Sequence, residues 1–289
     1  MKIIDCFTFY NELQLLEYRL SILYNVVDYF IIVESNQTHR GTNKELFYNK
    51  NKERFGKFKD KIIHIIVDLP YKYPNINFKN NKPFQLLNYN ENGDQWINEA
   101  FQRECIKNGF EQISLSDEDY IIVSDLDEIP DPKTLMSIKN EQISQFEIYK
   151  LKQDFYKYNL NSKQKEIWIH PYIMSYGFLK RYKTIAKPIE KWIYIEKGYK
   201  FIINNDNRMF LSELRLTFEG VSFLDKGGWH LSNFGNLNFI KNKQDTFSNV
   251  EAELFDNKII NEQEITRIKD NDYLPIGFEK YLSNFIVEW

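Results

Sequence analysis

Residues 120–130 read Tyr-Ile-Ile-Val-Ser-Asp-Leu-Asp-Glu-Ile-Pro, an apolar strand that ends in two carboxylates one residue apart. Continuous apolar character is typical of a central parallel strand that is covered on both faces. Open α/β sheets bind their ligands just beyond the carboxyl ends of such strands. Asp125 and Asp127 repel each other at that place, and a hard divalent cation, Mg²⁺ or Mn²⁺, is the usual compensation. The stretch therefore predicts an α/β sheet with a metal–diphosphate site, although many acidic turns also contain an isolated Asp-x-Asp.

The first 135 residues alternate apolar strands with amphipathic helices, which is the pattern of a sheet built from βαβ units. We expect strands over residues 3–7, 28–34, 61–67 and 120–124. Helices are expected over 12–26, over 96–108 with Gly109 as the C-cap, and after Asp131-Pro132. The Asn-rich residues 71–95 show no periodic pattern, and we interpret them as a loop at the rim of the site.

The pattern changes after residue 145 to shorter strands with alternating character. Such strands are expected over residues 146–151, 168–173 and 192–196, with a late helix over 262–269. They indicate an antiparallel or mixed extension of the sheet. Gly227-Gly228 is expected to form a turn. With no linker or internal repeat, the chain is predicted to be one domain.

The bulk properties exclude several classes of protein. The 38 Lys and Arg residues nearly balance 41 Asp and Glu residues, so the net charge of −3 gives no general attraction for nucleic acid. Two cysteines are too few for a disulfide framework or a structural zinc site. The chain shows no signal peptide and no apolar run of roughly 20 residues, so we expect a soluble, cytoplasmic protein without a transmembrane segment.

Three further segments carry polar side chains that fit a ligand site. Residues 34–44 follow the second strand and should open on the same sheet edge as the two aspartates, although they also fit a solvated loop. Glu99 and Arg103 lie four residues apart on one helix face, where they form an ion pair or leave Arg103 to reach a diphosphate. His230 follows Gly-Gly-Trp, and a lone histidine there is either structural or part of the metal site.

Taken together and in order, these motifs resemble glycosyltransferase family 17, the family of the bisecting β-1,4-N-acetylglucosaminyltransferase. The similarity covers most of the chain, except roughly residues 135–220, and Asn249 stands where many members carry histidine. It rests on residues 9–12, 16–20, 27–30, 34–38 with Gly41, Trp96 with Arg103, 124–130 and 228–232.

The resemblance implies a GT-A-like, Rossmann-type nucleotide-sugar-binding sheet with a mixed C-terminal extension. Residues 1–289 would form a single domain, with 1–135 as the donor-binding half and 136–289 as the acceptor-side and C-terminal half. The implied activity is inverting, metal-dependent transfer of a sugar, N-acetylglucosamine from UDP-N-acetylglucosamine, to a glycan acceptor with a β-linkage.

Roles for individual residues also come from the resemblance. Asp127 is expected to bind the metal directly and Asp125 to contact the ribose or a metal-bound water. His230 is a possible third metal ligand, which favours Mn²⁺ over Mg²⁺ because imidazole suits manganese better. Arg103 and Lys243 are candidates to bind the diphosphate, and Glu34 and Thr38 to contact the nucleoside. Glu128 is the candidate general base, with Asp206 and Asp225 as alternatives.

Three other functions place similar motifs in a chain. A sugar-phosphate nucleotidyltransferase uses closely related chemistry, and a non-catalytic sugar-binding module needs no base. A haloacid-dehalogenase-type phosphatase carries its Asp-x-Asp on the first strand, followed by Thr or Val, whereas here the motif begins at Asp125 and Ile129 fills that place. The sequence leaves the acceptor, the donor sugar and the oligomeric state open.

Overall fold

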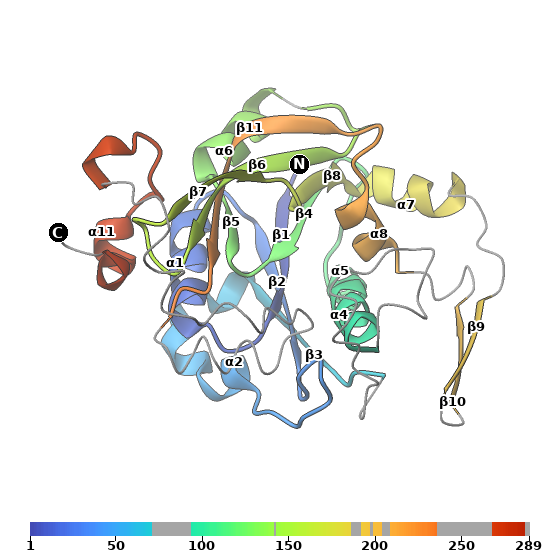
Figure 1. Cartoon of the computed structure of the whole chain (residues 1–289). Coiled ribbons are helices and arrows are strands. Elements are labelled where there is room, and N and C mark those ends of the chain that lie inside the picture. The colour runs from blue at the N-terminus through green and yellow to red at the C-terminus, as the bar shows by residue number, and fades with distance from the viewer. Residues whose placement is uncertain are drawn as a thin grey trace.

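A nine-stranded mixed sheet forms the centre of the structure, in the order β3-β2-β1-β4-β8-β6-β11-β5, with β7 paired to β6 (Figure 1). The computed structural model describes residues 1–70, 94–141, 143–185, 192–196, 199–203, 209–235 and 268–286. This mixed α/β architecture confirms the predicted fold class. Among these residues no helix is both long enough and apolar enough to cross a bilayer.

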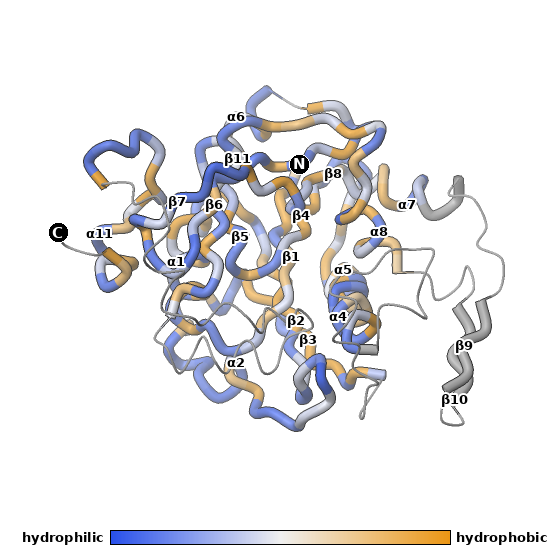
Figure 2. Tube along the Cα trace, viewed as in Figure 1, coloured by the Kyte–Doolittle hydropathy of each residue, from blue (hydrophilic) through white to orange (hydrophobic). Residues whose placement is uncertain are grey.

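The parallel half of the sheet consists of β3 (Ile62–Val67), β2 (Tyr29–Ser35), β1 (Ile3–Phe9) and β4 (Tyr120–Asp125). All four expected strands are therefore present. Alternate residues of these strands contribute to two separate cores, one against α1 (Leu13–Leu23) and one against α4 (Asp94–Glu104) and α5 (Lys107–Phe110). Apolar segments follow the central strands in Figure 2. The apolar run before Asp125 is explained, because residues 120–124 of β4 are fully buried between both cores.

The mixed half adds β8 (Tyr172–Ser175), β6 (Tyr149–Lys157), β11 (Ser222–Ser232), β5 (Glu128–Pro130) and β7 (Lys163–Trp168). β8 runs antiparallel to β4 and joins the two halves. β11 pairs in parallel with β6 and antiparallel with β5, which places His230 opposite Glu128. The mixed extension of the sheet is therefore confirmed.

The remaining elements surround this sheet or lie outside it. β9 (Trp192–Glu196) and β10 (Tyr199–Ile203) form a separate antiparallel pair. The other helical segments are α2 (Phe47–Lys50), η1 (Lys52–Lys61), α6 (Pro132–Glu141), α7 (Tyr176–Ile185), α8 (Phe210–Leu216), η2 (Ile268–Asp270), α11 (Phe278–Tyr281) and η3 (Ser283–Phe285). The helix expected after Asp131-Pro132 is thus α6, and the Asp131 carboxylate accepts a hydrogen bond from the Lys133 amide at its start.

Several helix boundaries differ from the prediction. The helix expected over 12–26 ends at Leu23, and the one expected over 96–108 is divided into α4 and α5. Gly109 lies inside α5 and is not a C-cap. A Cβ atom there would lie 2.6 Å from Ile31 Cγ2, so this glycine lets α5 approach β2 closely. Residues 71–93 and 262–267 lie outside the described residues.

Predictions for the mixed half were less accurate. The strand expected over 146–151 begins at Tyr149, and residues 169–171 separate β7 from β8, so a single strand over 168–173 is wrong. The turn expected at Gly227-Gly228 is also wrong, because both residues belong to β11 at an irregularity in its register with β6. Gly228 has φ +126°, and a Cβ atom on it would lie 2.0 Å from the Ile129 carbonyl oxygen.

We expect Gly228→Ala to lower the free energy of unfolding by about 3 kcal/mol or more, because it combines backbone strain with a clash against β5. Gly56→Ala is the matched control, since no atom lies within 4 Å of a Cβ atom there. The control should be neutral or slightly stabilising. Urea denaturation measures both, and similar values for the two variants would contradict the close packing of β11 on β5.

Candidate functional site

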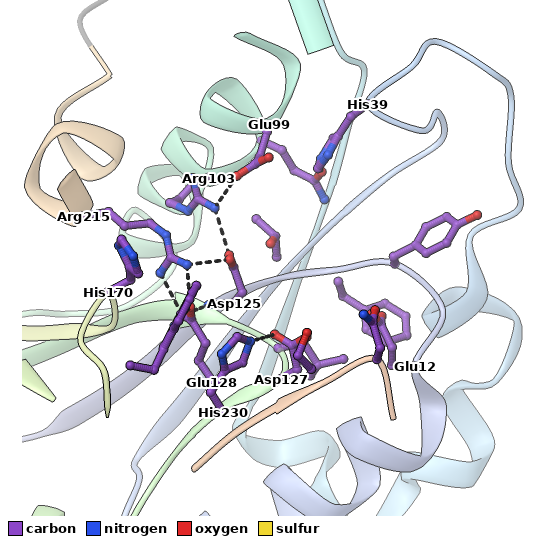
Figure 3. A pocket seen from close by; sticks show the side chains of 18 of the residues that line it. Glu12, His39, Glu99, Arg103, Asp125, Asp127, Glu128, His170, Arg215 and His230 are labelled. Atoms are coloured by element: carbon purple, nitrogen blue, oxygen red, sulfur yellow. Dashed lines mark hydrogen bonds and ion pairs between the residues drawn. The ribbon is translucent and has the colours of Figure 1, made fainter. Parts of the chain in front are cut away.

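A cavity of about 430 Å³ opens at the carboxyl ends of β1 and β4 (Figure 3). One wall comes from the end of β1, residues 37–44, α4 and the turn between β4 and β5. The other wall comes from β6, β7, α8 and the end of β11. The cavity therefore lies where the parallel and mixed halves of the sheet meet, at the edge that the sequence predicted.

Arg19 of α1 binds the backbone of the turn between β4 and β5, and its side chain is fully buried. Its Nη1 donates hydrogen bonds to the carbonyls of Asp125, Leu126 and Glu128 at 2.7, 3.0 and 3.1 Å. Its Nε and Nη2 bind the Asp5 carboxylate at 2.8 and 2.6 Å. The carbonyls of the turn thus face Arg19, while the side chains of its two aspartates line the cavity.

Asp125 lies between two guanidinium groups. Arg103 of α4 approaches one carboxylate oxygen at 2.9 Å, and Arg215 of α8 approaches the other at 2.7 Å (Figure 3). Burial alone would raise the pKa of Asp125, but Arg215 and Arg103 outweigh it and hold that pKa well below its usual range. Arg103 also binds Glu99 at 3.0 Å. The expected ion pair between Glu99 and Arg103 exists, and Arg103 additionally reaches the aspartate motif.

Glu128 is fully buried, and both of its carboxylate oxygens accept hydrogen bonds. Arg215 donates to them at 2.7 and 2.5 Å, the Trp168 indole at 2.5 Å and the Asp125 amide at 2.7 Å. Burial opposes ionisation of Glu128, yet Arg215 keeps its pKa below the usual value. A carboxylate with so many donors binds a proton weakly. The geometry therefore favours Glu128 as an anchor for Arg215 and Trp168 over its predicted role as the base.

Asp127 and His230 face each other in the wall of the cavity. The distance from Asp127 Oδ1 to His230 Nε2 is 3.7 Å. The imidazole lies parallel to Phe155, with ring centroids 4.7 Å apart, and 4.2 Å from the Trp168 ring, so aromatic packing fixes its plane. The Leu231 amide donates to the Asp127 carbonyl at 2.8 Å and ties β11 to the turn. The structure thus brings together the two residues that the sequence assigned to a metal.

A complete metal cage is absent from the described part of the chain, where no group of three or more His, Cys, Asp or Glu side chains could hold an ion. Asp127 and His230 nevertheless supply one oxygen and one nitrogen donor side by side. Mn²⁺ and Mg²⁺ commonly take only one or two ligands from the protein and the rest from water and phosphate oxygens. The pair fits such an ion.

The end of the cavity near β2 differs from the prediction. Glu34 is fully buried and does not line the cavity; it accepts hydrogen bonds from the Tyr48 amide and the His64 ring, both at 3.0 Å. Lys44 Nζ lies 3.8 Å from Glu34 and does line the cavity, and burial lowers its pKa to about 8. Thr38 lines the cavity as well. Glu34 is therefore placed to position Lys44, not to contact a ligand itself.

The remaining candidates lie elsewhere. Lys243 and Asp206 are outside the described residues. Asp225 does not line the cavity; its exposed carboxylate binds Lys152 at 2.9 Å. The geometry therefore gives no support to Asp225 as the alternative base.

Sequence reasoning missed several residues of the cavity wall, among them Arg215, Trp168 and His170. The only local signal for Arg215 was a basic residue within the otherwise apolar end of residues 210–216. Trp168 was assigned to a strand without a functional role. His170 lies in the connection between β7 and β8, and burial together with Arg215 lowers its pKa to about 4, so its ring is neutral near pH 7.

We expect Arg215→Gln to destabilise the protein by about 3–5 kcal/mol at pH 7, because Glu128 is left charged and buried without its cation. In the wild type, Arg215 depresses the pKa of Glu128. This contribution to stability is complete above the unfolded-state pKa, about 4.3, and is lost as the pH falls through the lower folded-state pKa. The variant lacks this contribution, and burial that Arg215 no longer opposes raises the pKa of its Glu128. That carboxylate therefore takes up a proton as the pH falls, and the difference between the two proteins should shrink between pH 7 and pH 4.

Urea denaturation at pH 7, 5 and 4 measures this difference. Arg181→Gln is the control, since Arg181 is exposed beside Phe146 and should contribute less than about 1 kcal/mol. A loss for Arg215→Gln no larger than that of the control, or one that is independent of pH, would contradict the buried charge network.

Comparison with known proteins adds the following findings. The profile of glycosyltransferase family 17 matches residues 1–200. No curated protein matches the chain significantly. Similar solved structures include 4-diphosphocytidyl-2C-methyl-D-erythritol synthase from Anaerococcus prevotii, at 11% identity and TM-score 0.36 over 83% of this chain and 95% of that chain. Another is the inositol-1-phosphate CTP transferase from T. maritima, at 13% identity and TM-score 0.36 over 85% and 97%. This level of structural similarity identifies no activity.

Proposed function

This chain belongs to glycosyltransferase family 17, and on that basis we propose that it transfers N-acetylglucosamine from UDP-N-acetylglucosamine to a glycan acceptor. The proposed reaction inverts the anomeric carbon, gives a β-linkage and depends on Mn²⁺ or Mg²⁺. The donor, the metal and the stereochemistry go beyond what membership of the family establishes. The charge and geometry of the cavity support the metal and a donor that carries a diphosphate.

The observation that carries the proposal is the charge of the cavity. Its described lining contains six carboxylates but only four basic side chains, a net charge of −2 when the histidines are neutral. The carboxylates are Glu12, Glu99, Asp125, Asp127, Glu128 and Glu166, and the basic groups are Lys44, Arg103, Lys157 and Arg215. A nucleotide diphosphate would be repelled by this lining unless a divalent cation accompanied it.

Asp127 and His230 are the residues that would hold this cation. When bound, it would act as a Lewis acid that stabilises the negative charge developing on the departing diphosphate. The stacking of His230 on Phe155 and its contact with Trp168 keep the imidazole in the plane that faces Asp127. These residues need no large rearrangement to receive the ion.

The diphosphate would lie beside the two guanidinium groups that flank Asp125. Arg103 and Arg215 both line the cavity, and charge-assisted hydrogen bonds from guanidinium to phosphate are among the stronger polar contacts in proteins. Lys243 remains a candidate from the sequence. The nucleoside would lie toward Thr38 and Lys44, where the ring of Tyr10 is 5.3 Å from the Lys44 ammonium.

We expect Asp127→Asn to lower sugar transfer at least about 100-fold, because removing a direct ligand should cost no less than the loss of a supporting residue. The amide keeps the shape of the side chain but loses its charge. Transfer is measured as UDP release, and Mn²⁺ affinity by calorimetry. Wild-type transfer at full rate in excess EDTA, or unchanged Mn²⁺ affinity of the variant, would contradict the metal site.

The donor and the stereochemistry have separate tests. In the presence of Mn²⁺, UDP-N-acetylglucosamine should raise the melting temperature more than other nucleotide sugars, since ligand binding stabilises the folded state by mass action. Proton NMR of the product should show the large anomeric coupling of a β-glycoside. An α-linked product would contradict inversion. Release of diphosphate from a nucleoside triphosphate and a sugar phosphate would indicate a nucleotidyltransferase instead.

A further inference from the structure

The proposed reaction needs a carboxylate that can accept a proton from the acceptor hydroxyl, and most carboxylates of the cavity are already engaged. Asp125 and Glu99 bind Arg103, and Glu128 binds Arg215 and Trp168. Asp127 faces His230. A carboxylate held by cations or assigned to the metal is a weak base.

Glu12 and Glu166 are the two other carboxylates of the described lining, and they differ in position. Glu12 is largely buried, accepts a hydrogen bond from the Asn11 amide at 3.1 Å and lies beside Lys44. In Figure 3, Glu12 lies on the Asp127 side of the site. His170 and Arg215 lie on the opposite side. Glu12 thus belongs to the end of the cavity proposed for the nucleoside, and not to an end where the acceptor would be expected.

Glu166 lies on β7, whose two faces have different surroundings. Glu166 and Trp168 line the cavity. Lys165, which precedes Glu166, and Ile167, which lies between the two, are exposed and do not line it. Successive residues of a strand point to opposite faces, so Glu166 and Trp168 share the face toward the cavity. The Glu166 side chain is exposed at the rim and has no hydrogen bond or ion pair with any described residue.

The same face of β7 is fixed relative to Asp127 and His230, the two proposed metal ligands. Trp168 donates its indole N–H to Glu128 at 2.5 Å, and its ring lies 4.2 Å from the ring of His230. Two residues along a strand correspond to about 7 Å, so Glu166 stands within one strand repeat of the side chain that contacts His230. It is also open to solvent, from which an acceptor must enter.

From these observations we infer that Glu166 is the proton acceptor of the transfer and that the Glu166–Trp168 face of β7 receives the acceptor. The O–H bond of the acceptor breaks and its proton goes to a carboxylate oxygen of Glu166. The freed electron pair forms the new bond to the anomeric carbon, while the bond from that carbon to the diphosphate breaks and its electrons leave with UDP. This inference rests on the proposed function.

The test compares acceptors that do and do not need a base. With water as the acceptor, Glu166→Gln should slow UDP release from UDP-N-acetylglucosamine at least about 100-fold, the usual contribution of general-base catalysis. With azide, an anion that carries no proton to remove, the variant should stay within about threefold of the wild type. Its affinity for UDP with Mn²⁺, measured by thermal shift, should be unchanged.

Lys165→Gln, on the opposite face of β7, is the matched control and should resemble the wild type with both acceptors. Near-normal UDP release by Glu166→Gln in water would overturn the assignment, and so would an equal loss with water and azide, which indicates a structural role. If the wild type itself releases no UDP from any nucleotide sugar with either acceptor, the proposed function fails and not this assignment alone.

Discussion

One buried guanidinium group determines the shape of the site. Arg19 makes six hydrogen bonds, to Asp5, to Ser124 and to three carbonyls of the turn between β4 and β5. Burying such a charge is costly unless its hydrogen bonds are satisfied, and here the ion pair with Asp5 and the turn carbonyls satisfy them. Because those backbone carbonyls point toward Arg19, the side-chain carboxylates of the turn line the cavity. The Asp-x-Asp motif thus depends on a residue of α1 that no ligand would touch.

A second set of charges extends this arrangement across the cavity. Arg215 joins Asp125 to Glu128, and Arg103 joins Asp125 to Glu99, so acidic and basic groups alternate from α8 through the turn to α4. Each cation is shared by two carboxylates, which leaves the lining acidic. An acidic lining of this kind would attract the positively charged ion that we propose. It would also orient the guanidinium groups before any phosphate arrives, and such preorganisation strengthens electrostatic interactions.

The parallel half could be predicted from sequence because its signals are local. The run from Tyr120 to Val123 is apolar because both faces of β4 are covered, and parallel strand ends meet at one edge, which brings Asp125 near residues 34–44. Glu34 was misjudged because a polar residue at the end of a strand is expected to be exposed, whereas His64 and Tyr48 enclose it. Arg215 and Trp168 could not be placed, since their positions depend on pairing between distant strands. Gly228 was mistaken for a turn because the composition of a turn and of a strand irregularity is the same.

The junction of the two halves explains why that glycine matters to the site. β11 pairs with β6 along one edge and with β5 along the other, and at Gly228 its backbone passes so close to Ile129 that no Cβ atom fits. Two residues later the same strand presents His230 to Asp127. A side chain at position 228 would push β11 away from β5 and lengthen the distance between the two proposed metal ligands. The glycine therefore contributes to the geometry of the proposed metal site through the backbone, although it has no side chain to bind anything.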